Sequence, residues 1–97
     1  MATTIATGSF KSPVITIAGQ GLRCLYWLDG TVLKGQIRDA ANNVVRATFD
    51  AITGVDADGG ASAAPSVLQG GKYRMVLLAT VDGDLRQYTS SDGVAWS

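Results

Sequence analysis

The sequence contains neither histidine nor glutamate, and only one cysteine, among its 97 residues. Without histidine, the serine–histidine and cysteine–histidine pairs that activate common nucleophiles are excluded. The single Cys24 cannot form an internal disulfide, and it stands in the apolar run from Leu22 to Leu28, so we expect a small buried thiol. The acidic residues are all aspartates in turns or at strand ends, where they do not form the carboxylate pair of an ordinary glycosidase. We therefore predict that the protein is not an enzyme.

A net charge and a long apolar run are also missing. Eight basic residues balance eight acidic ones, so no excess charge attracts nucleic acid or an anionic membrane. No apolar stretch reaches the roughly 18 residues that a membrane-spanning helix requires. The opening residues, MATTIATGSFK, contain no basic region followed by an apolar one, so we expect no secretion signal. The sequence also predicts no cofactor and no metal, because the aspartates between residues 56 and 84 lack the closing glutamate of a calcium loop.

Signals for β-strands dominate what is present. Threonine, valine, isoleucine and tyrosine recur in short runs that end at Asn, Asp and Gly, whereas the three-and-four spacing of an amphipathic helix is absent. The stretch from Gly54 to Ala64 holds small and acidic residues and is predicted to be a loop. The predicted strands are Val14–Ala18, Leu22–Leu28, Val32–Arg38, Val44–Phe49, Tyr73–Val81, Leu85–Ser90 and the short Val94–Ser97.

The pattern restarts after about 52 residues. Four landmarks recur in the same order: Pro13 and Pro65, Arg23 and Arg74, Asp29-Gly30 and Asp82-Gly83, and Leu33 and Leu85. The spacing equals the length of a propeller blade, although glycine-rich turns can also align by chance. We predict a single all-β domain, residues 1–97, built from two propeller-like antiparallel units at about 1–48 and 49–97.

A chain of two such units has exposed sheet edges and apolar faces at both ends. Residues 2–10 have strand composition and precede Pro13 as residues 44–52 precede Pro65, so we interpret them as a strand that completes the last sheet of a neighbouring copy. Propellers close at about four to eight blades, and we favour three copies and a six-bladed ring, a homotrimer. The alternative is closure within one chain, as a β-sandwich or barrel.

The end of the sequence resembles the Asp-box of sialidase-type β-propellers, whose pattern is Ser-x-Asp-x-Gly-x-Thr-Trp. The match runs from Ser90 to Trp96, lacks one residue before the tryptophan and has Ala95 where threonine is usual. The resemblance implies a structural turn in which Asp92 accepts backbone N–H groups and Gly93 adopts a positive φ. It also implies that Trp96 packs between neighbouring sheets.

The organisation is similar to that of small bacterial fucose-binding lectins, which carry two blades per chain and form trimeric six-bladed rings. Their blades place an arginine on one strand, an acidic residue after the next turn and a tryptophan after an Asp-Gly turn. Arg74, Gln87 and Trp96 follow this order, and Arg23 with Gln36 repeats part of it, with glutamine in place of the acidic residue. The resemblance implies a glycan site at these residues, since arginine and tryptophan supply paired donors and an aromatic platform.

Simpler readings of the same residues stay open. Trp96 suits packing between sheets, and Arg23 and Arg74 suit surface ion pairs with Asp29 or Asp84. The neutral charge and the richness in alanine, glycine and threonine favour a virion surface protein of a tailed bacteriophage, a decoration or appendage protein. The alternative is a lectin-like module. The expected partners are copies of the chain and other virion proteins or a glycan, and the expected location is the virion or the cytoplasm where the chain is made.

Overall fold

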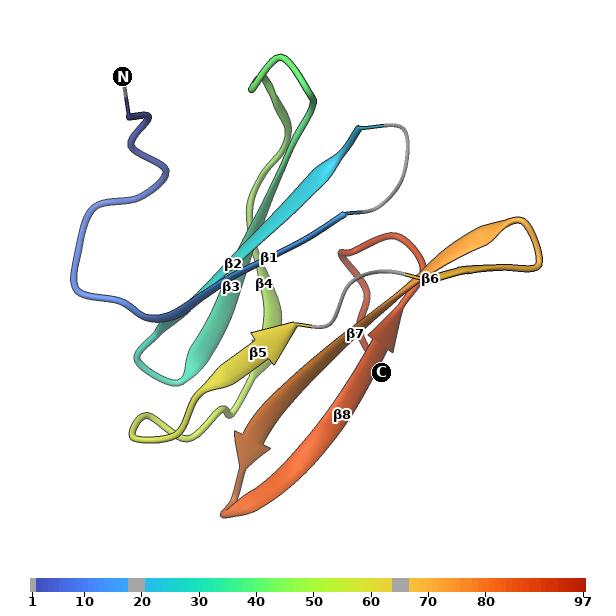
Figure 1. Ribbon diagram of the computed structural model, residues 1–97. Helices are drawn as coiled ribbons and strands as arrows, with labels where there is room; N and C mark the ends of the chain where they lie inside the picture. Colours follow the sequence, from blue (N-terminus) through green and yellow to red (C-terminus); the bar gives the residue numbers. More distant parts are fainter. Residues whose placement is uncertain (1, 18–20, 64–66) are drawn as a thin grey trace.

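Two antiparallel β-sheets make up the fold (Figure 1). The computed structural model describes residues 2–17, 21–63 and 67–97, and this part of the chain contains eight strands and no helix. The all-β prediction is confirmed. A helix able to cross a membrane is likewise not found among the described residues.

Sheet 1 is a meander in which each strand pairs with the next one along the chain. Its strands are β1 (Lys11–Ile17), β2 (Arg23–Asp29), β3 (Val32–Arg38) and β4 (Val44–Thr53). Gly30 and Thr31 form a two-residue turn between β2 and β3, a length typical of hairpins. The turn before β4 is closed by Asp39, whose carboxylate accepts the backbone N–H of Asn43 at 2.9 Å. The strands predicted in this region are confirmed, with ends that differ by at most four residues; the predicted end at Ala18 lies outside the described residues.

Sheet 2 is built around its longest strand, β7. Its strands are β5 (Ala61–Ala63), β6 (Val67–Gln69), β7 (Lys72–Val81) and β8 (Asp84–Ser90). β7 pairs with β5, β6 and β8. The prediction of a loop from Gly54 to Ala64 is wrong at its end, because Ala61–Ala63 pair with Leu77–Ala79. Backbone hydrogen bonds need no large side chain, so these small residues form a strand despite their composition.

The connection between the sheets, residues 54–60, forms hydrogen bonds with the turns of both sheets. The backbone N–H of the fully buried Val55 donates to the Thr31 carbonyl at 2.9 Å. The carboxylate of Asp56 accepts the backbone N–H groups of Asp82 and Gly83 at 3.0 and 2.9 Å. The connection therefore holds the β2–β3 turn of sheet 1 near the β7–β8 turn of sheet 2.

One hydrophobic core lies between the two sheets. Because side chains alternate along a strand, Cys24, Tyr26 and Leu28 of β2 enter this core while their neighbours project from the opposite face. From sheet 2 the core takes Met75, Leu77 and Ala79 of β7, all fully buried. The expected buried thiol is confirmed, and burial raises the pKa of Cys24. We call the faces that meet here the inner faces of the two sheets, and the opposite faces their outer faces.

The two ends of the chain form no strands. Residues 2–10 lie outside both sheets (Figure 1). The predicted strand Val94–Ser97 is reduced to one backbone pair, in which Thr89 and Ser97 exchange hydrogen bonds of 2.9 and 3.1 Å. The chain bends around Asp92 before it returns to β8, and this bend leaves too few residues for a regular ladder.

Candidate binding surface

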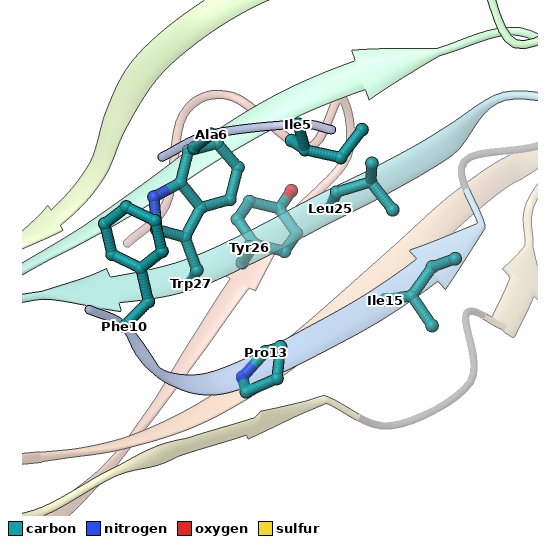
Figure 2. Close-up of a pocket in the computed structure, with 8 residues that line it drawn as sticks. All are labelled: Ile5, Ala6, Phe10, Pro13, Ile15, Leu25, Tyr26 and Trp27. Atoms are coloured by element: carbon teal, nitrogen blue, oxygen red, sulfur yellow. The ribbon is translucent and has the colours of Figure 1, made fainter. Parts of the chain in front are cut away.

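An apolar groove lies on the outer face of sheet 1 (Figure 2). Residues before β1 form one wall and strands β1 and β2 form its floor. Its volume is about 500 Å³, within the range of about 300–1,000 Å³ that is typical of small-molecule pockets. The lining residues are Ile5, Ala6, Phe10, Pro13, Ile15, Leu25, Tyr26 and Trp27.

Alternation along β2 positions the floor of this groove. Leu25 and Trp27 lie between the core residues of β2, so their side chains project from the outer face. Trp27 is only 6% exposed, because the Phe10 ring covers it with the ring centroids 6.1 Å apart. Ile15 pairs with Leu25 across the ladder and is 56% exposed. The floor is therefore apolar, and part of it is open to solvent.

The groove offers little for acid–base chemistry. Tyr26 is the only lining residue with an ionisable side chain, and its phenol lies on the core side of the sheet, where it donates to the Gly93 carbonyl. Burial there raises the pKa of Tyr26. The indole Nε1 of Trp27 is buried without a hydrogen-bond partner among the described residues. This surface is suited to burying apolar side chains rather than to activating a substrate.

The predicted residue Arg23 lies on the same outer face, at the far end of β2. It stands directly opposite Arg38 in the ladder. Its Nη2 donates to the Asp39 carbonyl at 3.1 Å and to the Asn42 side-chain oxygen at 3.3 Å. These contacts replace the ion pair with Asp29 that we considered.

Gln36, the second predicted residue of this unit, pairs with Leu25 on the same face. Its side-chain oxygen accepts from Arg38 Nε at 2.7 Å, and its amide donates to Thr48 Oγ1 at 3.4 Å. Gln36 is 7% exposed. Arg23 and Gln36 therefore share a face, and both are engaged in contacts within the chain.

The other three predicted residues are not brought together. Arg74 is exposed on β7, and Gln87 is exposed on β8 opposite Leu78, so alternation places both on the outer face of sheet 2. The Trp96 ring instead packs against the core, edge-on to Tyr26 with centroids 5.6 Å apart. Trp96 thus lies on the inner side of the sheet, away from the two polar side chains.

The residues of the Ser90–Ala95 segment form one tight turn. The Ser90 hydroxyl oxygen accepts the backbone N–H of Gly93 at 2.9 Å. Asp92 Oδ1 accepts the backbone N–H groups of Val94 and Ala95 at 2.9 and 3.0 Å. These N–H groups, of Ala95 first and then Val94, stabilise the carboxylate and lower the pKa of Asp92. Gly93 has a positive φ of 82°.

The same turn attaches the C-terminal tail to sheet 1. The Gly93 carbonyl accepts both the Tyr26 hydroxyl and the Trp96 indole N–H, the latter at 3.1 Å. A Cβ atom at Gly93 would lie 2.8 Å from Cys24 Sγ. The turn is therefore packed closely on the core, in the manner of a structural element.

The groove is the feature that sequence reasoning missed. The signal was present in Leu22–Leu28, which is apolar on both faces, a pattern typical of a strand covered on both sides. The described part of the chain contains no cluster of three or more His, Cys, Asp or Glu side chains that could hold a metal ion. Comparisons with known protein families, curated proteins and solved structures found no match.

Proposed function

We propose that this chain is a non-enzymatic structural module that assembles with copies of itself on the surface of a bacteriophage virion, as a decoration or appendage protein. The observation that supports this proposal most is that both outer sheet faces carry exposed apolar side chains. Sheet 1 carries the groove with Ile15 at 56% exposure, and sheet 2 carries Leu85 at 71% exposure. An apolar groove that is open to solvent often marks a binding site, and the exposed Leu85 adds an apolar side chain on the other outer face.

The segment of residues 2–10 also supports self-association. It lies outside both sheets of its own chain, although its threonine, isoleucine and phenylalanine residues are common in strands. Strand edges without partners are liabilities that a strand from another chain removes. We propose that, on assembly, this segment leaves the groove that it lines and pairs with an open sheet edge of a neighbouring copy, and that three copies form a closed ring of six sheets.

The glycan-binding alternative has less geometric support. A sugar site of the kind considered requires an aromatic platform near its hydrogen-bond donors. Trp96 packs on Tyr26 in the core, whereas Arg74 and Gln87 lie on the outer face of sheet 2. The balanced charge and the richness in small residues are compatible with a structural protein of a virus particle.

Particle composition tests this function. Particles purified from cells that carry the gene should contain the chain in a fixed ratio to the major capsid or tail protein, as measured by quantitative mass spectrometry. Recovery of the chain only in the fraction without particles would contradict the virion role. Selective binding of one carbohydrate on a glycan array would favour the lectin alternative.

A further inference from the structure

Two hairpins, one in each sheet, have turns of the same length. β2 and β3 are closed by the pair Asp29–Val32, and β7 and β8 by the pair Val81–Asp84, each around a two-residue turn. These closing pairs lie 52 residues apart in sequence. In a two-residue hairpin the closing pair exchanges both backbone hydrogen bonds, so superposing the closing pairs also superposes corresponding faces.

This superposition relates the inner face of sheet 1 to the outer face of sheet 2. It places Cys24 on Val76 and Tyr26 on Leu78, given the shift of 52 residues. Cys24 and Tyr26 are buried in the core, whereas Val76 and Leu78 lie half-buried on the opposite side of β7 from the core residues.

The remaining two faces correspond in the same way. Leu77 and Ala79, which form the inner face of sheet 2, superpose on Leu25 and Trp27, which form the outer face of sheet 1. The core within the chain therefore joins one face of the hairpin in sheet 1 to the non-equivalent face of the corresponding hairpin in sheet 2. Such a contact is heterologous, and it can be repeated by adding further units.

We propose that copies of this chain associate head to tail, with the outer face of sheet 2 of one copy packed on the outer face of sheet 1 of the next. This contact would repeat between chains the face-to-face packing that forms the core within one chain. It rests on the self-association proposed above and assigns the two surfaces that meet. Rotation between successive copies decides whether a closed ring or a filament results.

Each of the two surfaces presents an exposed apolar side chain for this contact. The outer face of sheet 2 presents the exposed Leu85, which superposes on the buried Leu33 of sheet 1. The exposed Arg74 and Gln87 lie on the same face. The outer face of sheet 1 offers the apolar floor of the groove, with its exposed Ile15.

A mixing experiment with two one-sided variants tests the proposal. Leu85→Asp places a charge on the outer face of sheet 2, and Ile15→Asp places one on the outer face of sheet 1. Both side chains are mostly exposed, at 71% and 56%, so circular dichroism should show both variants folded. Ala41→Asp, in the exposed β3–β4 turn, adds the same charge away from both faces and is the matched control.

Each one-sided variant alone should be monomeric in native mass spectrometry, with association weakened at least about tenfold because an unpaired carboxylate resists burial. An equimolar mixture should form one-to-one pairs and nothing larger, since each pair uses its only intact contact. The control should assemble as the unaltered chain does. Assembly of either one-sided variant at the unaltered size, or no pairs in the mixture, would overturn the proposal. A monomeric unaltered chain would instead contradict self-association itself.

Discussion

Gly93 is the residue on which the contacts of the C-terminal turn converge. Its carbonyl accepts hydrogen bonds from Tyr26 and Trp96, and its N–H donates to Ser90. Its φ of 82° lies in the left-handed region, and a Cβ there would lie 2.8 Å from Cys24 Sγ. Both conformation and space therefore require glycine.

Gly93→Ala should destabilise the fold clearly more than Gly30→Ala. Gly30 also has a positive φ, of 64°, but nothing lies within 4 Å of a Cβ built there. The left-handed conformation alone costs about 1–2 kcal/mol, and overpacking against the core should add about 1–3 kcal/mol at Gly93. Urea denaturation of the two variants measures the difference. Equal losses would show that the turn is not packed on the core as described.

At the scale of strands, the sequence predicts the elements well where alternation is strong. The strand Val32–Arg38 was predicted with the observed bounds, because a two-residue turn and an Asn/Asp turn limit it. β5 and β6 were missed, since each contains only three residues and gains its order from pairing with β7. Local composition does not reveal such a partner far along the chain.

The candidate glycan residues show a second limit of sequence reasoning. Their order along the chain suggested a shared site, but sharing a face depends on register. Arg74 and Gln87 do lie on one face, whereas the turn at Asp92 sends Trp96 to the other side of the sheet. If a turn is one residue longer or shorter, every side chain of the following strand points to the opposite face. The sequence does not specify the length of this turn to one residue.

The N-terminal segment is the element with the clearest predicted effect on assembly. Deleting residues 2–10 removes the Phe10–Trp27 contact and the Asn42–Thr3 hydrogen bond, but it removes no member of the buried core. We expect the truncated chain to fold and to remain monomeric. The aromatic pair is worth about 1 kcal/mol beyond the area that it buries, and exposing the Trp27 ring should cost roughly 1.5–3 kcal/mol more. Circular dichroism and sedimentation velocity measure the two properties.

Thr3→Ala is the control for this deletion, because it removes the hydrogen bond to Asn42 and leaves Phe10 in place. It should assemble normally. A truncated chain that assembles to the same size as the full chain would show that residues 2–10 do not complete a neighbouring sheet.

For the whole molecule, the central feature is that each sheet has apolar side chains on both faces while one core covers only the inner ones. A small domain of this length buries only about 60–65% of its unfolded surface, so contacts with other copies would stabilise it further. Association of this kind depends on concentration, and the melting temperature should rise with it.

The mass of the native assembly tests this account most directly. Native mass spectrometry or sedimentation equilibrium at micromolar concentration should give one species at three times the chain mass of 10.1 kDa. A stable monomer of 10.1 kDa under the same conditions would contradict the account.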